Sequence, residues 1–377
     1  MTSWTGCTWS RKPRRRRWGV DHLPFFINEL EQRGLRLPTV EEFASSLAPM
    51  KAPEDEIRFN HIGLVTEVGA DLLVAIRTSD RHFRFMPGPE FSPRLYRGET
   101  TFHNPCLPSV FRDGISPIDR CFAIGKWIEL SALMDHHPAT HDLKECRIGD
   151  LSFDLNIEAI AQHYGFRTRL MDFSRSKDVA MFFATCQYDP VTESYAPMRK
   201  GTAVLYTVDL KGLIDHRKGD ASFLPLGLEP LPRPEAQRAL AVRLNPCESL
   251  NDMPWVSRQE LEVTPELSQR YFDMFDGGAM LFPSNPFDDQ VRAIRETRRL
   301  PLEALAFGMD QGLIPHHPEG VNGARNALFL AGYEVELCPM SVPPETVKAA
   351  QDEWEHKKSD YFSRIRVRGV ADHIIMN

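Results

Sequence analysis

The chain has 377 residues, of which 42% are hydrophobic and 26% charged, as in an ordinary globular protein. Its seven cysteines are scattered and none forms a Cys-x-x-Cys pair, which argues against a disulfide framework or a cysteine-rich zinc site and favours a reducing, cytoplasmic setting. No apolar run approaches the ~20 residues that a membrane span needs, so no membrane association is expected.

Charge is unevenly distributed along the chain. The net charge is −7, yet residues 1–20 carry six basic side chains and no acidic one, so the remainder carries −13 (39 basic against 52 acidic). An acidic body is a poor non-specific binder of nucleic acid, because phosphate contacts supply most of that affinity. We expect residues 1–20 to be a disordered basic tail, which either has no role or contacts nucleic acid or another acidic partner.

Residues 21–60 are expected to form a helical lead-in that packs on the main body. Apolar residues recur there at near-helical spacing, and Thr39 is a candidate N-cap. From residue 61 the pattern becomes richer in strands. Residues 72–76 predict a short apolar strand or a buried helix, and residues 93–98 predict a strand that ends at Gly98.

Helices and strands then follow one another as far as residue 210. The apolar spacing predicts helices over residues 118–134, 157–164 and 178–187, and strands over residues 168–173 and 201–210. The expected caps are Asn156 or Asp154 at the start of the second helix, Gly165 at its end, and Ser174 or Ser176 at the start of the third.

The remaining third of the chain has a less regular pattern. Residues 211–260 are rich in proline and charge and are expected to be loops with short helices, whereas residues 270–282 predict a Gly-Gly break followed by an apolar strand. Residues 294–335 predict a strand, a helix, a loop and a helix. Strands and helices mix without regular alternation, which indicates an α+β fold with a mixed sheet and surrounding helices. The expected divisions are a basic tail (1–20), the lead-in (21–60), a main domain (61–340) and a C-terminal extension (341–377).

Two segments carry the most distinctive residues. The first is Tyr96-Arg97-Gly98-Glu99, followed by Pro108-Ser-Val-Phe-Arg112. The second runs from Gln162-His163-Tyr164-Gly165 through Thr168-Arg-Leu-Met-Asp172 to the helix after Ser174-Arg-Ser176. In this order they resemble the FRG domain family, in which Phe-Arg-Gly-Gln precedes Pro-Ser-Leu-Phe-Arg, Gln-His-Tyr-Gly and Thr-Arg-Leu-Leu-Asp. Tyr96, Glu99 and Lys177 stand where the family has Phe, Gln and Pro, and the resemblance covers residues 91–210 best.

Arg97 and Asp172 are the first candidate site residues. Arginine presents a planar fork of donors that suits a phosphate or a carboxylate, and Gly98 beside it lets a ligand approach the backbone. Asp172 stands between two apolar residues in a predicted strand, so it needs a partner, for which Arg97 and Arg169 are the candidates. The alternative is that Arg97 is a buried structural arginine tied to Asp172 or Glu99.

The end of one predicted helix and the start of the next add further candidates. His163 should lie near Asp172, either as a ligand contact or as a satisfied core histidine. Ser174 and Ser176 precede a helix whose first amides can hold an anion, and simple N-capping is the alternative. The histidine pair at residues 136–137 fits no standard zinc spacing, so no metal site is expected.

The segment Phe173-Ser-Arg-Ser176, with the helix after it, is also similar to the Ser-Thr-Ser region of Arg-Ser-Glu type ADP-ribosyltransferases. That resemblance implies an ADP-ribosyltransferase-like core with NAD as its substrate, in which an acid assists bond cleavage as in glycoside hydrolysis. It implies NAD-binding roles for Tyr96, Arg97, Gly98, His163, Tyr164, Arg169, Ser174 and Ser176, and catalytic roles for Asp172, Asp276 and Glu99. The acid of the third motif is open among Glu260, Glu262, Glu266 and Asp276, of which only Asp276 falls near a predicted strand.

Three functions of different classes remain as hypotheses. The first is an enzyme that cleaves NAD or transfers ADP-ribose to a protein or nucleic acid, as a toxin or a phage-defence effector. The second is a non-catalytic module that senses a nucleotide or nucleic acid, and the third is a structural scaffold. An open cleft on which Arg97, Asp172 and Ser174 converge near an acid favours the enzyme, whereas a sealed ion-pair network favours the scaffold.

Overall fold

The computed structural model describes residues 35–39, 42, 73–87, 94–217, 223–225, 229–337, 340–366 and 370–371. The expected basic tail (1–20) lies outside these residues, as does most of the expected lead-in (21–60). Within that lead-in, Thr39 accepts the backbone N–H of Glu42 at 3.2 Å, and Glu42 accepts the backbone N–H of Thr39 at 2.9 Å. This reciprocal pair is a capping box and confirms Thr39 as an N-cap.

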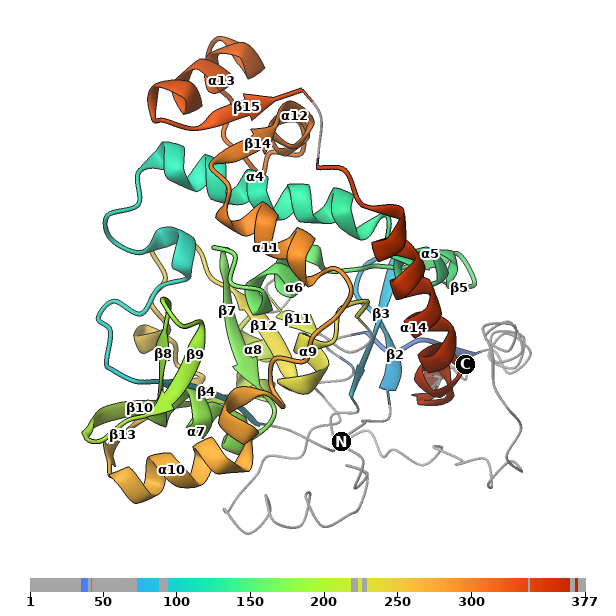
Figure 1. Cartoon of the computed structure of the whole chain (residues 1–377). Coiled ribbons are helices and arrows are strands. Elements are labelled where there is room, and N and C mark those ends of the chain that lie inside the picture. The colour runs from blue at the N-terminus through green and yellow to red at the C-terminus, as the bar shows by residue number, and fades with distance from the viewer. Residues whose placement is uncertain are drawn as a thin grey trace, which may run out of the picture.

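Two β-sheets form the centre of the molecule (Figure 1). The larger is antiparallel and contains, in spatial order, β11 (Phe223–Pro225), β12 (Ala239–Arg243), β7 (Leu170–Ser174), β4 (Arg94–Glu99), β10 (Gly201–Asp209) and β13 (Val256–Val263). The smaller is mixed and contains β16 (Ile365–Arg366), β2 (Leu73–Arg77), β3 (His82–Pro87), β6 (Leu151–Phe153) and β5 (Arg147–Ile148).

Three short ribbons and a set of helices surround these sheets. The ribbons are β1 (Leu35–Arg36) with β17 (Val370–Ala371), β8 (Cys186–Asp189) with β9 (Ser194–Pro197), and β14 (Arg299–Pro301) with β15 (Glu334–Glu336). The helices are α4 (Pro117–Met134), α5 (Pro138–Glu145), α6 (Ile157–His163), α7 (Lys177–Thr185), α8 (Leu210–His216), α9 (Arg233–Ala236), α10 (Pro265–Met274), α11 (Asp288–Glu296), α12 (Leu302–Asp310), α13 (Gly320–Leu330) and α14 (Pro344–Ser363). The 3-10 helices are η3 (Ser109–Phe111), η4 (Leu250–Asp252) and η5 (Asp276–Gly278). The mixture confirms the α+β class, and none of the described helices is long and apolar enough to cross a membrane.

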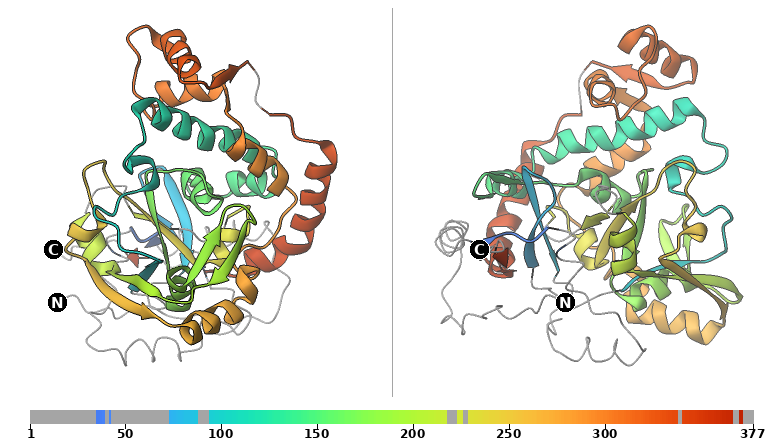
Figure 2. Two further views of the ribbon diagram at one scale, coloured as in Figure 1. Left: turned by 60° about the vertical axis from the view of Figure 1, so that its left-hand side comes forward. Right: turned by 180° about the vertical axis from the view of Figure 1, so that it is seen from behind.

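A helical layer closes one end of the molecule, as both views of Figure 2 show. Helices α4, α6, α11, α12 and α13 each contribute apolar side chains to one core, among them Leu130, Ile160, Ile294, Leu305 and Leu328. Burying one such side chain is worth roughly 1.5–3 kcal/mol, so this core holds α6 firmly against the long helix α4.

The smaller sheet packs against the C-terminal helix. Phe83, Phe85 and Phe153 form a cluster of ring contacts, and Trp354 and Phe362 of α14 belong to the same core. Strand β16, which follows α14, pairs with β2 in parallel. Within the segment expected as a C-terminal extension, β16 therefore belongs to the second sheet and α14 packs in the core beside it.

Most elements predicted between residues 93 and 210 are confirmed, together with their caps. Asn156 accepts the N–H of Ala159 at 3.1 Å at the start of α6, and Gly165, at φ +80°, follows the end of that helix. Ser176 rather than Ser174 caps α7, because its hydroxyl accepts the N–H of Val179 at 3.4 Å.

Two predictions for the later chain are wrong. Residues 211–260 contain the expected short helices, but they also contain β11, β12 and the start of β13, which were not expected. Strand β12 is buried between β11 and β7, so its apolar run shows no alternation that would reveal a strand. Residues 270–282 contain no strand, because α10 runs to Met274 and the chain then turns at Gly277 (φ +64°) and Gly278 (φ +103°). Both glycines adopt the left-handed region, which ends a helix rather than starting a strand.

The larger sheet splits between β4 and β7. Strand β4 pairs with β10 over six residues, but it pairs with β7 at a single position, Tyr96 opposite Ser174. Beyond this pair the two strands lack a shared ladder of hydrogen bonds. The split creates the space in which polar side chains of both strands meet.

Gly98 lets helix α7 approach β4 closely. A Cβ atom at this position would lie 1.8 Å from the backbone oxygen of Ala180 and 2.8 Å from the backbone nitrogen of Ala184. Backbone atoms of a packed helix cannot move aside for a side chain, so only glycine fits at this position.

We therefore expect Gly98→Ala to lower the free energy of unfolding by at least ~2 kcal/mol, because the added methyl overpacks the contact between α7 and β4. Urea unfolding followed by circular dichroism measures the change. Ser257→Ala, on the exposed strand β13, serves as a control that should change stability by less than ~0.5 kcal/mol. An unchanged midpoint for Gly98→Ala would contradict this packing.

Candidate functional site

A cavity of about 400 Å³ lies beside the split between β4 and β7. Its polar lining includes Arg97, Gln162, His163, Asp172 and Gln237. Its aromatic lining includes Phe183, Tyr188, Tyr195 and Phe282, which come from α7, the β8–β9 hairpin and the segment after η5. The combination of apolar rings with a few convergent polar groups is typical of a small-molecule site.

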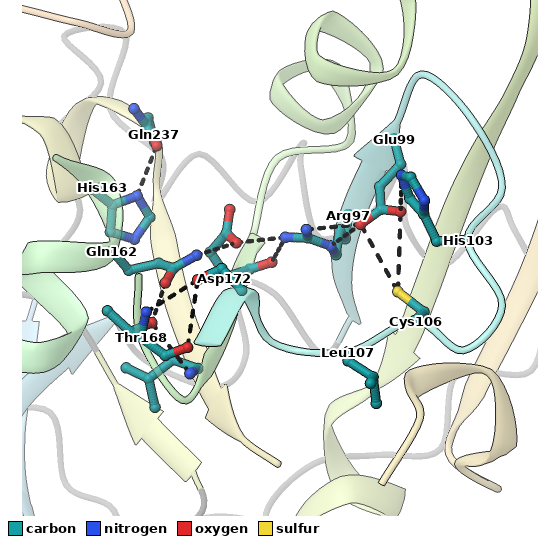
Figure 3. A network of polar contacts seen from close by, with 12 residues as sticks. Arg97, Glu99, His103, Cys106, Leu107, Gln162, His163, Thr168, Asp172 and Gln237 are labelled. Carbon is teal, nitrogen blue, oxygen red and sulfur yellow. Dashed lines mark hydrogen bonds and ion pairs between the residues drawn. The ribbon is translucent and has the colours of Figure 1, made fainter. Parts of the chain in front are cut away.

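Arg97 spans the split between the two strands (Figure 3). Its Nη1 donates to the backbone oxygen of Asp172 at 3.0 Å and to Asp172 Oδ1 at 2.5 Å. On its other side, Nε donates to Glu99 Oε1 at 2.9 Å, and Nη2 lies 2.8 Å from the same oxygen. The guanidinium group thus connects β4 to β7 where backbone pairing has stopped, and all three of its nitrogens are already engaged.

Asp172 is the acid that faces the cavity. Its side chain is 33% exposed, whereas that of Glu99 is 8% exposed. Burial alone would raise the pKa of Asp172, but the positive charge of Arg97 outweighs it and lowers the pKa from the ordinary 3.8 to about 2. Asp172 is therefore ionised at neutral pH.

A second donor keeps Asp172 in place. Gln162 of α6 donates through Nε2 to Asp172 Oδ1 at 3.1 Å, and its own Oε1 accepts the hydroxyl of Thr168. Arg97 and Gln162 both donate to Oδ1. In the described contacts, Oδ2 is therefore the carboxylate oxygen that remains for a ligand.

Glu99 lies at the more enclosed end of the network. The thiol of Cys106 is 3.9 Å and 4.0 Å from its two carboxylate oxygens, and Nε2 of His103 is 3.9 Å from Oε2. Burial, with the charge of Glu99, raises the pKa of Cys106 to about 11, so this cysteine is a protonated thiol and not a nucleophile. Glu99 thus acts as the partner of Arg97, away from the exposed part of the cavity.

Gln237 determines which nitrogen of His163 carries the proton. Gln237 donates through Nε2 to the backbone oxygen of Leu281 at 3.1 Å, and its Oε1 lies 2.7 Å from Nδ1 of His163. A carbonyl oxygen only accepts, so the amide must present Oε1 to the ring, and Nδ1 must be the N–H donor. Burial lowers the pKa of His163, which is therefore neutral, and its Nε2 is a buried acceptor without a partner among the described residues.

The two serines are occupied by local structure. Ser174 donates to the backbone oxygen of Gln237 at 2.8 Å and accepts the N–H of Ser176 at 3.0 Å. Ser176 caps α7. Ser174 lines the cavity wall, whereas Ser176 does not belong to it.

Several other predicted site residues lie away from the cavity. Tyr96 and Gly98 line it, but Tyr164 is buried beneath the guanidinium of Arg233 at 4.3 Å. Arg169 points elsewhere and donates to Glu158 at 3.0 Å and 2.7 Å, so Arg97, rather than Arg169, is the arginine that pairs with Asp172 in the described contacts.

The candidates for a third-motif acid also lie outside the cavity lining. Asp276 lies on η5 rather than on a strand. Glu260 and Glu262 lie on the exposed edge strand β13, contrary to the expectation that only Asp276 falls near a strand, and Glu266 lies in the first turn of α10. Within the described part of the chain, the carboxylates of the cavity are Glu99 and Asp172.

Sequence reasoning missed some residues of the site. Gln162 belongs to the Gln-His-Tyr-Gly segment and could have been included on that basis. Gln237, Tyr195 and Phe282 come from segments without a distinctive pattern, and only the fold brings them to the cavity.

The fold and the cavity define an α+β domain with an arginine held between two acids beside an aromatic-walled pocket. Residues 92–193 match the family model of the FRG domain, so this chain carries an FRG domain. The matched segment includes β4, α6, β7 and α7, which supply most of the polar network. No curated protein and no solved structure matches the chain.

The pKa of Asp172 predicts a pH dependence of stability. Because the folded pKa lies below the unfolded one, Asp172 contributes stability above about pH 4. That contribution disappears as the pH falls towards the folded pKa, about 2. The wild type should therefore lose more unfolding free energy between pH 5 and pH 2 than Asp172→Asn does. Asp135→Asn, at an exposed position, is the control and should follow the wild type; identical slopes for wild type and Asp172→Asn would contradict the ion pair.

The orientation of Gln237 predicts the tautomer of His163. Nitrogen NMR of the histidine rings should show His163 protonated at Nδ1 and neutral at pH 7. Gln237→Glu should raise the pKa of His163, because a carboxylate beside Nδ1 stabilises the imidazolium ion. Gln269→Glu, on the exposed face of α10, should leave that pKa unchanged. A wild-type ring protonated at Nε2 would refute the assignment.

Proposed function

We propose that the FRG domain binds NAD in this cavity and cleaves the bond between nicotinamide and ribose. ADP-ribose then passes to water or to an acceptor on a protein or nucleic acid. The observation that carries the proposal is Asp172, an ionised carboxylate that is held by Arg97 and Gln162 and remains exposed to the cavity.

The chemistry requires such a group. When the glycosidic C–N bond breaks, its electron pair leaves with nicotinamide and a positive charge develops on the ribose carbon and ring oxygen. A fixed carboxylate beneath the ribose stabilises that charge more strongly than it stabilises the ground state. The oxygen of water or of the acceptor then bonds to the ribose carbon, and its proton is released to the solvent. Asp172 can fill this role without changing its own protonation state.

The charges, aromatic lining and volume of the cavity support this ligand. Arg97, Glu99 and Asp172 together carry a formal charge of −1, which suits the cationic nicotinamide ring better than a phosphate. The stacked rings of Tyr195 and Phe282, with centroids 5.3 Å apart, offer an apolar wall for a planar heterocycle. A cavity of about 400 Å³ is within the usual range for small-molecule sites.

In this proposal Arg97 is a positioning residue. Its nitrogens are engaged by Glu99 and Asp172, so a bidentate grip on a phosphate would require one of these ion pairs to break. Arg97 instead keeps Asp172 ionised and directs it towards the ribose. This role differs from the direct NAD contact that the family resemblance implies.

An enzyme that consumes NAD would deplete the cell that contains it. That consequence fits a toxin or a phage-defence effector, and it places the protein and its acceptor in the cytoplasm, where NAD is present. The N-terminal basic segment is a candidate contact for an acidic partner.

The test is to incubate the purified chain with NAD labelled in the adenine half, alone and with cell lysate, and to follow nicotinamide release and label transfer. Asp172→Asn keeps the shape of the side chain but removes its charge, and it should reduce turnover by about a hundredfold or more. Arg97→Ala should also abolish turnover, whereas the exposed control Asp135→Asn should not reduce it.

The result of this experiment distinguishes an enzyme that cleaves NAD from a module that only senses a nucleotide. Binding of NAD without turnover, by protein that circular dichroism shows to be folded, would reject the catalytic proposal and favour a non-catalytic nucleotide-sensing module. Neither binding nor turnover, alone and with lysate, would reject NAD as the ligand.

A further inference from the structure

The pyrophosphate of NAD needs a cationic partner. The arginine and histidine side chains that the sequence predicted to bind NAD already have other partners. Arg97 is held by two carboxylates, and Arg169 is paired with Glu158 outside the cavity. His163 is neutral, and Gln237 occupies its N–H. A phosphate therefore requires another donor in the cavity wall.

Arg112 meets this requirement. It lines the cavity at the end of η3, and its Nε donates to the backbone oxygen of Leu107 at 3.3 Å. No carboxylate among the described residues forms an ion pair with Arg112. The nitrogens of Arg97 are all engaged. Among the described contacts, the two terminal nitrogens of Arg112 are therefore the guanidinium donors of the cavity wall that remain for a ligand.

The position of Arg112 is coupled to that of Asp172. The N–H of Val110 donates to the backbone oxygen of Thr168 at 3.3 Å, and the N–H of Thr168 donates to Ser109 Oγ at 3.0 Å. Thr168 also donates its hydroxyl to Gln162, which in turn holds Asp172. One residue thus links the turn before Arg112 to the acid on β7.

We propose that Arg112 binds the pyrophosphate of the dinucleotide, so that the anionic part of the ligand lies at the η3 end and the nicotinamide riboside lies at Asp172. The identity of the ligand rests on the function proposed above. Arg112 is an exposed residue, and a guanidinium group suits a phosphate because its nitrogens can donate two parallel hydrogen bonds. The negative charge of Asp172 disfavours the reverse orientation, because it would repel the pyrophosphate.

The experiment compares Arg112→Gln with the wild type on three probes: NAD, nicotinamide riboside, which lacks phosphate, and inorganic pyrophosphate. KM is measured for the two substrates, and pyrophosphate binding is measured by calorimetry at low ionic strength. We expect Arg112→Gln to raise KM for NAD about tenfold or more, as the loss of a charged hydrogen bond predicts, and to leave kcat nearly unchanged. It should leave KM for the riboside unchanged and abolish pyrophosphate binding. Arg325→Gln, on the exposed surface of α13, is the charge-matched control and should resemble the wild type throughout.

The other possible results test the Arg112 assignment and the NAD proposal separately. A KM for NAD that matches the Arg325→Gln control, or an equal loss with the riboside, overturns the assignment of Arg112. If the wild type turns over neither substrate, but pyrophosphate binds to the wild type and not to Arg112→Gln, the anion site is supported and the proposal of NAD cleavage is rejected. If the wild type neither turns over NAD nor binds pyrophosphate, both proposals fail.

Discussion

The ion pairs of Arg97 hold together the part of the molecule in which the larger sheet is split. Strands β4 and β7 share one paired position, and beyond it Arg97 crosses from β4 to the backbone and carboxylate of Asp172. Removing the arginine would leave two acids in a poorly solvated place, and such an uncompensated charge typically costs about 3–5 kcal/mol. The same interaction therefore stabilises the opening of the sheet and keeps the cavity's acid ionised.

Directional hydrogen bonds also order the side chains near Arg97 and Asp172. A backbone carbonyl orients Gln237, which in turn orients the ring of His163. Thr168 orients Gln162, which holds Asp172. Among the described contacts, Nε2 of His163 and Oδ2 of Asp172 are acceptors that receive no side-chain donor. In the function proposed above, these acceptors would receive hydroxyl donors of the ribose.

The cavity has a polarity that matters for the proposed chemistry. In that proposal, Asp172 suits the cationic nicotinamide ring of the bound dinucleotide and the positive charge that develops on the ribose as neutral nicotinamide leaves, whereas Arg112 adds a positive charge to the lining beside η3. Gly98 allows α7 to pack closely on β4, so this part of the wall is built on two packed elements of regular structure.

The sequence alone was enough to predict most local helices and strands between residues 93 and 210 and to single out the two segments with distinctive motifs. Helix caps such as Thr39, Asn156 and Ser176 follow from short-range rules, and the order of motifs identified the FRG domain. Short-range rules misjudged β12, because a strand buried on both sides lacks the alternation of an exposed one. Only the tertiary structure decided that Arg97 pairs with Asp172 and Glu99, that Gln237 reaches His163, and that Glu260 and Glu262 lie on an edge strand. These pairings join residues up to 75 positions apart, and such contacts depend on how the strands are ordered in the sheet rather than on their neighbours in the chain.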